Sequence, residues 1–520
     1  MNIAHLLSAR VATHGDHAAI LDHSRGTRRR FNFVQIDRGA SNLASQLLRE
    51  GLQPGDAVLL LHPVSAELFM LFIAVLRCGL VAVFIDPSEG REHLERCCAL
   101  RPPRAMIGCA KAHLLRLVSP ALRRIPLKFS TDMPVWGAQR MNPERTGSKP
   151  CGIHEAQSDA PAIIRFTSGS TGQPKAAVRT HGYLLEQQRV LQRSFGLTPG
   201  EVDLVTMPLF VLSNLAAGVT SLIPPVDLSS PGRVPPATVL EEIQRERPQR
   251  ITAAPALLYN LAEHCRNTGR TLEGVERIFT GGAPVFPRLL EELKEVAPGA
   301  DIVAVYGSTE AEPIALLHYH ELSKEDRARP AEGNGLPAGT PDEAIRIRIL
   351  REDGTAAASG MSAEEFTSAC LPAGEMGEVV VAGPHVLPGY LSDEDNRRIK
   401  IRVDGEVWHR TGDAGYLDNK GRLWLLGRSA ARICDPRGTL YPFQVEGVAM
   451  EAPWVRRAAL FARDGRRVLA IESREDHDRE TLMEQLAWAR LDAIQVVARL
   501  PVDRRHNSKI DYQSLEASIL

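Results

Sequence analysis

The strongest constraint on the fold is a series of short apolar runs. These runs show no alternation of polar and apolar residues, and segments long enough for helices join them. Residues 57–61 and 81–85 are two such runs, and residues 68–77 between them are long enough for a helix. Strands that are apolar on both faces are typical of parallel sheets covered by helices on both sides. Because residues 277–280 and 302–305 are further short runs of this kind, the sequence predicts an α/β fold.

The length of 520 residues predicts more than one domain. We expect a large domain over residues 1–427, made of sheets covered by helices. After Arg428 the chain becomes rich in arginine, and the alternating strand and helix segments become shorter. A strand is expected at 468–471 and a helix at 481–490. Residues 428–520 are therefore predicted to form a small, mobile α+β domain. Residues 353–374, rich in Ala, Ser, Gly and Thr, are predicted to be irregular.

Composition excludes several classes of partner. Hydrophobic residues make up 44%, charged residues 24%, and the net charge is −1, so nothing in the charge favours nucleic acid or an anionic membrane. Eight cysteines show no Cys-x-x-Cys pair, which predicts reduced thiols. Residues 1–16 lack the pattern of a signal peptide, and the most apolar stretch, 68–76, is too short for a membrane span. We expect a cytoplasmic protein without a transmembrane segment.

A loop rich in glycine and hydroxyl residues follows the strand expected at 162–164. Its candidate phosphate-binding residues are Thr167, Ser168, Gly169, Ser170, Thr171, Gly172 and Lys175. Glycines let successive N–H groups point into one anion-binding concavity, hydroxyls bond phosphate oxygens, and lysine adds a positive charge. This composition suits a nucleoside triphosphate, and the alternative is an ordinary surface loop. The stretch is not a Walker loop, because Pro174 and Ala176 break that pattern.

Two further strands end in residues that suit a nucleotide. The first runs into Gly281, Gly282 and Ala283, where glycines allow a flat ligand to approach, although a plain turn is the alternative. The second runs into Tyr306, Gly307, Ser308, Thr309 and Glu310. An aromatic ring can stack on a base and a carboxylate can ligate Mg²⁺. The alternative for Glu310 is an acid at the start of a helix.

Two other candidates lie towards the C-terminus. Asp413, between Gly412 and Ala414, is suited to accept hydrogen bonds from two ribose hydroxyls, although an acid at a turn is usually structural. Lys509 is a single lysine near the end of the chain, and on its own it would be an ordinary solvated side chain.

In this order and at these spacings, the motifs closely resemble those of the adenylate-forming superfamily, which comprises acyl-CoA ligases, luciferases and peptide-synthetase adenylation domains. The resemblance covers nearly the whole chain. It implies that ATP and Mg²⁺ bind and that a carboxylic acid is converted to an acyl-AMP plus pyrophosphate. It further implies that Thr167 and Glu310 bind the metal, that Asp413 holds the ribose, that Arg428 closes the large domain, and that Lys509 is the catalytic lysine of the small domain.

The chain departs from the acyl-CoA ligase pattern at several positions. The aromatic-histidine pair is replaced by Phe210-Val211, the hinge position is Ala430, and the Ile-Lys-x-x-Gly signature becomes residues 433–438 with Cys434 in place of lysine. The terminal Ser-Gly-Lys has Ser508 in place of glycine. Because the hinge and the glycine-rich segment serve the CoA-binding conformation, these departures argue against a thiolation step.

One branch of the superfamily shares these departures. Residues 438–442 and 501–510, together with 85–87 and 208–210, are similar to the β-lactone synthetases of bacterial long-chain olefin biosynthesis. That resemblance implies a 2-alkyl-3-hydroxy long-chain fatty acid, activated as acyl-AMP and closed to a β-lactone by its own 3-hydroxyl. It is compatible with assembly with other enzymes of the same lipid pathway.

Two alternatives remain from the sequence. One is a fatty acyl-CoA or acyl-AMP ligase, and the other is a non-catalytic acyl- or nucleotide-binding protein. The base that deprotonates the 3-hydroxyl is also open, with His318, His409 and His506 as candidates by residue type alone.

Overall fold

The computed structural model describes residues 1–24, 26–145, 151–168, 174–228, 230–352, 360–473, 478–503, 509–512 and 514–515. Contacts divide the chain into two compact units. The first comprises Met1–Leu228 and Pro384–Arg398, and the second comprises Ser229–Gly383 and Ile399–Leu520.

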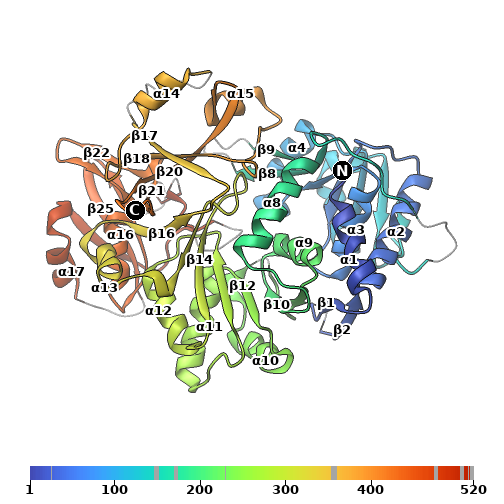
Figure 1. Ribbon diagram of the computed structural model, residues 1–520, viewed down its shortest axis with the longest axis horizontal. Helices are drawn as coiled ribbons and strands as arrows, with labels where there is room; N and C mark the ends of the chain where they lie inside the picture. The colour runs from blue at the N-terminus through green and yellow to red at the C-terminus, as the bar shows by residue number, and fades with distance from the viewer. Residues whose placement is uncertain are drawn as a thin grey trace. The chain divides into compact units, whose positions relative to one another are not determined.

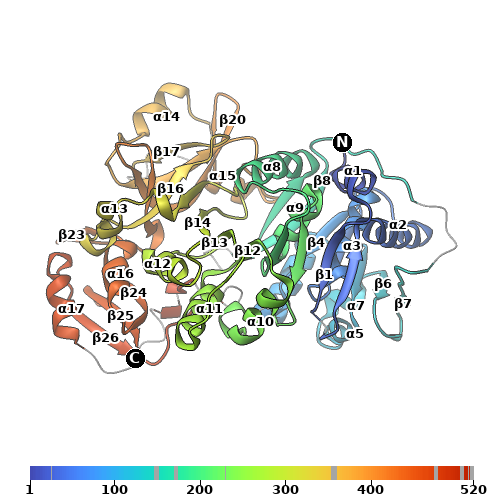
Figure 2. The same ribbon diagram turned by 60° about the horizontal axis from the view of Figure 1, so that its bottom comes forward.

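The first unit alternates strands with helices (Figure 1). Its longer helices are α1 (Ala4–His14), α2 (Phe33–Arg49), α3 (Ala66–Arg77), α4 (Arg91–Leu100), α8 (His181–Ser194) and α9 (Pro208–Ala217). One sheet has the order β7-β6-β5-β3-β4-β8-β9. Its strands are β3 (Ala57–Leu61), β4 (Val81–Phe84), β5 (Ala105–Gly108), β6 (Leu127–Ser130), β7 (Gln139–Arg140), β8 (Pro161–Ser168) and β9 (Pro174–Thr180). The views in Figures 1 and 2 both show α1, α2 and α3 side by side.

Strands β3, β4, β5, β6 and β8 pair in parallel, as the apolar runs predicted. All five residues of β3 are buried, because helices occupy the connections between these strands. The last pair differs, since β8 and β9 are antiparallel neighbours along the chain. A second group of strands in this unit contains β10 (Val202–Val205), β11 (Thr220–Ile223), β1 (Ala18–Asp22) and β2 (Arg29–Asn32), in that order.

The second unit begins with three parallel strands, β12 (Arg250–Ala253), β13 (Arg277–Gly281) and β14 (Asp301–Tyr306). Helices α10 (Pro236–Glu246), α11 (Pro255–Thr268) and α12 (Pro287–Val296) connect or precede them. From β14 onwards the pairing is antiparallel, in the order β14-β15-β16-β21-β20-β18-β17. These strands are β15 (Ala315–His318), β16 (Leu336–Pro341), β17 (Arg346–Leu350), β18 (Gly377–Ala382), β20 (Glu406–Leu417) and β21 (Leu423–Arg428), with β19 (Lys400–Val403) on β20.

The chain after Arg428 forms its own small sheets. They are the hairpin of β22 (Ile433–Asp435) and β23 (Gly438–Leu440), and the sheet of β24 (Val455–Arg463), β25 (Arg466–Ser473) and β26 (Ala493–Val497). Helices α16 (Pro442–Glu451) and α17 (Arg479–Gln485) share a buried apolar cluster with this sheet. Whether residues 428–520 move as a separate domain remains a prediction.

Two predictions of secondary structure need correction. Residues 363–369 are helical rather than irregular (α14, Ala363–Ala369). A capping box between Ser362 and Glu365 starts this helix, and Phe366 is buried against a local apolar cluster. The helix expected at 481–490 runs from Arg479 to Gln485 only, followed by a short 3₁₀ turn and by Arg490 in the left-handed region with φ of 50°.

No helix among the described residues is long and apolar enough to cross a membrane, as the sequence predicted.

Candidate functional site

Tyr306, Asp413 and Arg428 form a hydrogen-bonded cluster in the second unit. The Tyr306 hydroxyl donates to Oδ2 of Asp413 at 2.8 Å, and Nη1 of Arg428 lies 3.2 Å from Oδ1 of the same carboxylate. Nη1 of Arg428 also donates to the carbonyl of Thr411 at 3.1 Å. The structure therefore brings together three residues that lie far apart in the sequence and were predicted to share a site.

Strand geometry accounts for this cluster. Tyr306 is the last residue of β14, and Asp413 and Arg428 are directly opposite one another on β20 and β21. Gly412, with φ of 71°, allows β20 to turn before Asp413. Burial, reinforced by the Asp413 carboxylate, raises the pKa of Tyr306, so its hydroxyl stays a donor. The same carboxylate raises the pKa of Arg428.

Glu310 lies in a tight turn after β14. The N–H of Ser308 donates to the carbonyl of Ala311 at 2.7 Å, and the N–H of Glu310 donates to Oγ of Ser308 at 3.1 Å. No helix starts within residues 306–314, all of which are described, so the helix-start interpretation of Glu310 is wrong. Its charge contributes to the raised pKa of Arg428, so Glu310 lies within electrostatic range of the cluster.

A lysine that was not singled out from the sequence also lies near Glu310. Lys400 begins β19, opposite His409 of β20, and only 4% of the residue is exposed. Burial lowers the pKa of Lys400 to about 7, while the charge of Glu310 opposes that shift. The sequence offered little signal for this lysine, because lysines are rarely buried and it stands among Arg397, Arg398 and Arg402.

Gly281 and Gly282 lie at the end of β13, as predicted. A Cβ atom on Gly281 would lie 2.4 Å from the carbonyl oxygen of Val305 on β14, and Gly282 has φ of 77°. Close strand packing and a turn therefore both require glycine here, whether or not a ligand binds. A role of Gly281, Gly282 and Ala283 in nucleotide binding stays a prediction.

The predicted phosphate loop connects two antiparallel strands. Thr167 at the end of β8 pairs with Lys175 at the start of β9, and Ser168 pairs with Pro174. A hairpin is a different setting from the strand-to-helix turn of a Walker loop, in agreement with the motif. Gly169, Ser170, Thr171 and Gly172 lie outside the described residues, as do the side chains of Thr167 and Ser168.

The segment that carries Lys509 is bonded to the chain just before it. The N–H of Lys509 donates to Oδ1 of Asp503 at 2.9 Å, and the N–H of Asp503 donates back to the carbonyl of Lys509 at 2.8 Å. Three residues later the Tyr512 hydroxyl donates to Oε1 of Glu446 at 2.7 Å. Burial raises the pKa of Tyr512, and the nearby Arg428 acts against that shift. The Tyr512 hydroxyl therefore lies within electrostatic range of Arg428.

The candidate histidines differ in position. His318 ends β15 and bonds Asp301 at the start of β14, so it lies at the opposite end of β14 from Tyr306. His409 is buried on β20, with 3% exposed. His506 lies outside the described residues. If the nucleotide binds at the Tyr306 end, His318 is excluded as a base there.

Comparisons with known proteins agree with this fold. The model of the family described as AMP-binding enzyme matches residues 7–391. The olefin beta-lactone synthetase of Stenotrophomonas maltophilia (strain K279a) is 34% identical over 93% of this chain and 90% of its own length, and that of Xanthomonas campestris pv. campestris is 32% identical over the same shares.

Solved structures show the same fold. The amide bond synthetase McbA from Marinactinospora thermotolerans superposes with a TM-score of 0.81 at 24% identity, covering 99% of each chain. O-succinylbenzoate coenzyme A synthetase from Bacillus subtilis, in complex with ATP and magnesium ion, superposes with a TM-score of 0.77 at 22% identity, covering 98% of each.

The family match and the two relatives that cover most of the chain identify an adenylate-forming enzyme. With three quarters of its length matched, the chain belongs to the AMP-binding enzyme family. It is an ATP-dependent enzyme that forms an acyl-adenylate.

Proposed function

We propose that this enzyme is a Mg²⁺-dependent β-lactone synthetase that acts on long-chain 2-alkyl-3-hydroxy fatty acids. The observation that carries the proposal is the 34% identity to an olefin beta-lactone synthetase along 93% of the chain. An acyl-CoA ligase is the principal competing function.

The proposed reaction has two steps. The substrate carboxylate attacks the α-phosphorus of ATP, which forms the acyl-AMP and releases pyrophosphate. The 3-hydroxyl oxygen then attacks the activated carbonyl carbon, the bond to AMP breaks, and the hydroxyl proton is lost as the four-membered lactone closes. Because nucleophile and electrophile belong to one molecule, proximity replaces a second substrate. A carboxylate is already a nucleophile, so the first step requires no general base.

The residues of the cluster suit the nucleotide. A carboxylate has about four lone-pair sites, and Asp413 uses one on each oxygen for Tyr306 and Arg428. The remaining sites can accept two ribose hydroxyls, and the ion pair with Arg428 helps to fix the orientation of the carboxylate. Lys175 and the hydroxyl residues of the hairpin loop are proposed to hold the phosphates.

The donor set also suits the metal. Glu310 offers carboxylate oxygen, the ligand type that Mg²⁺ prefers, and Thr167 is proposed to add a hydroxyl. When bound, Mg²⁺ would offset the charge of the phosphate oxygens during adenylation. The charge of Glu310 acts on the buried Lys400, so we propose that Lys400 helps to balance that carboxylate when no metal is bound. Lys509 is proposed to stabilise the charge that develops as the carboxylate attacks phosphorus.

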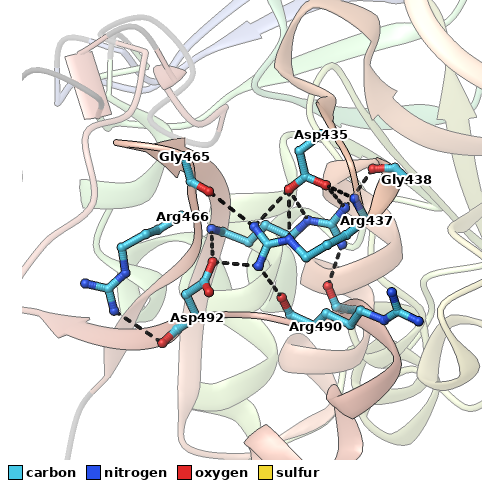
Figure 3. A network of polar contacts seen from close by, with 9 residues as sticks. Asp435, Arg437, Gly438, Gly465, Arg466, Arg490 and Asp492 are labelled. Atoms are coloured by element: carbon cyan, nitrogen blue, oxygen red, sulfur yellow. Dashed lines mark hydrogen bonds and ion pairs between the residues drawn. The ribbon is translucent and has the colours of Figure 1, made fainter.

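The segment that replaces the CoA-ligase signature is held by charged hydrogen bonds. Figure 3 shows Asp435, at the end of β22, between two guanidinium groups. Arg467 donates to both carboxylate oxygens, at 2.7 and 3.0 Å, and Arg437 donates from its Nε and Nη2 at 3.0 and 2.8 Å. Arg467 also donates to the carbonyl of Gly438, and Arg437 to Asp492.

These bonds tie the β22–β23 hairpin to β25 and to the residues before β26. The guanidinium of Arg467 holds the pKa of Asp435 well below its usual range, so the network persists at neutral pH. All of these residues lie within 428–520, so the bonds stiffen the hairpin inside this region. We propose that residues 428–520 still act as a lid during adenylation, since they carry Lys509.

Product analysis tests the proposal. The full-length enzyme is incubated with ATP, Mg²⁺ and a 2-alkyl-3-hydroxy long-chain acid, with and without CoA, and products are identified by mass spectrometry. The expected product is the β-lactone, 18 mass units below the acid, in equal yield with and without CoA. A CoA thioester as the principal product would overturn the proposal.

A further inference from the structure

A second cluster of polar side chains lies at the other end of β14. Asp301 is the first residue of this strand, His318 is the last residue of β15, and His320 follows in a 3₁₀ turn. Val303 and His318 are opposite one another in the register, so the start of β14 and the end of β15 lie side by side. His318 and His320 are two residues apart, which brings both imidazoles to the same carboxylate.

The candidate ligand atoms lie close together, with each imidazole on a different oxygen of Asp301. Nδ1 of His318 lies 2.7 Å from Oδ2 of Asp301, and Nδ1 of His320 lies 3.1 Å from Oδ1. The two imidazole centroids are 5.4 Å apart. One ligand atom from each residue falls within 4.8 Å of the others. We propose that Asp301, His318 and His320 bind one divalent transition-metal ion, with Zn²⁺ as the best-suited species.

The distances suit such an ion. With bonds of about 2.0–2.1 Å in a tetrahedral site, neighbouring ligand atoms lie roughly 3.3 Å apart. The nitrogen-to-oxygen distances of 2.7 and 3.1 Å need to open only slightly as the ion replaces the shared protons. Two imidazoles and one carboxylate are typical zinc ligands, whereas Mg²⁺ and Ca²⁺ prefer oxygen alone. Water would supply the fourth ligand.

Exposure and charge also suit a metal ion. The side chains of Asp301 and His318 are about 30% exposed and that of His320 is 66% exposed, so an ion can enter from solvent. Glu321 adds a nearby negative charge that acts on His318. The alternative is that the three side chains only hydrogen-bond to one another and bind no metal.

Zinc titration of the tag-free, chelator-treated full-length protein decides whether this cluster binds a metal ion. Calorimetry with ZnCl₂ alone compares the wild type with His318→Ala, His320→Ala and Asp301→Asn, and with His264→Ala as a control histidine on α11. The wild type and the control should bind one Zn²⁺ with the same affinity at this site. Each cluster variant should lose that event or bind at least about tenfold more weakly.

Two further measurements address two complications of the titration. A cluster variant could lose zinc binding because it folds poorly, and zinc could bind to cysteine thiols elsewhere in the protein. Zinc should raise the melting temperature of the wild type but not of His318→Ala. X-ray absorption of the loaded wild type should show nitrogen and oxygen around the metal, without sulfur. Identical isotherms for the wild type and all cluster variants, the absence of a binding event, or a sulfur-containing shell would each overturn the proposal. None of these measurements depends on enzymatic activity.

Discussion

The hydroxyl of Tyr306 donates a 2.8 Å hydrogen bond to Asp413, a residue 107 positions away along the chain. This bond joins the end of β14 to β20 and aligns the Asp413 carboxylate with Arg428 on β21. A charged hydrogen bond in a half-buried setting is stronger than a neutral one. The proposed ribose acid is therefore held in place before any nucleotide arrives.

Asp413→Ala should weaken ATP binding far more than acyl-substrate binding. Hydrogen bonds to a charged group contribute about 1.5–3 kcal/mol each, so the loss of even one predicts at least a tenfold rise in the nucleotide dissociation constant. Tyr306→Phe keeps the carboxylate and should have a smaller effect in the same direction. Calorimetry with a non-hydrolysable ATP analogue measures both, with the exposed Glu375→Ala as control. Unchanged nucleotide affinity in Asp413→Ala would count against the assignment.

Lys509→Ala should slow acyl-AMP formation while the fold remains intact. A single positioned donor that stabilises transition-state charge is worth about 10²–10³ in rate. ATP–pyrophosphate exchange reports this half-reaction directly, and Lys420→Ala, which removes an exposed lysine from a turn, is the matched control. Exchange at the wild-type rate in Lys509→Ala would rule out the catalytic role.

The strands were more predictable than the site. Residues 57–61 match β3 at both ends, because an uninterrupted apolar run is a local signal. The joining of β8 and β9 into a hairpin was not apparent, because pairing direction depends on the partner strand. The capping box at Ser362 was a local signal for α14 that composition obscured.

Within the site, residue identities could be predicted but their contacts could not. Asp413 and Arg428 were candidates from the sequence, yet their register on the neighbouring strands β20 and β21 includes an irregularity after Asp413. The bond from Tyr306 joins residues 107 positions apart, which no local pattern indicates. Lys400 and Glu446 were missed because neither belongs to a motif. Only their burial marks them as unusual, and burial of a single polar residue is set by tertiary packing.

The Glu446→Gln variant should gain stability relative to the wild type as pH rises from 5 to 8. The quantity compared is the free energy of unfolding. Glu446 accepts hydrogen bonds from the Leu460 N–H at 2.9 Å and from Tyr512, and burial raises its pKa from 4.5 to about 7. The folded state therefore holds this proton more tightly than the unfolded state. Its contribution to stability is complete below about pH 4.5 and is lost as pH rises through 7.

A glutamine at position 446 has the same shape and loses nothing over that range. Because one pKa unit corresponds to about 1.4 kcal/mol, the difference in unfolding free energy should change by at most a few kcal/mol. Denaturant titrations at pH 5, 6, 7 and 8 measure it, with the exposed Glu375→Gln as control. Parallel profiles for the wild type and Glu446→Gln would show that Glu446 does not titrate in this window.

The last prediction concerns CoA, which should neither accelerate turnover nor enter the product. The hinge position is Ala430, within a short 3₁₀ turn, and the following hairpin is tied down by Asp435 and Arg467. A CoA ligase needs its small domain to rearrange after adenylation, and such rearrangements are absorbed at a few hinge residues. A lactone-forming enzyme needs no incoming thiol, because the 3-hydroxyl already lies beside the activated carbonyl.

A pair of substrates separates the two chemistries. The 3-hydroxy acid should release AMP over multiple turnovers, whereas the matching 3-deoxy acid should stall as bound acyl-AMP after about one turnover, because it lacks the internal nucleophile. Quenched-flow measurement of AMP and acyl-AMP, with and without CoA, follows both substrates in one experiment. If the 3-deoxy acid turns over readily once CoA is supplied and yields a thioester, the enzyme is a CoA ligase. In that case the bonds around Asp435 serve only the stability of the β22–β23 hairpin.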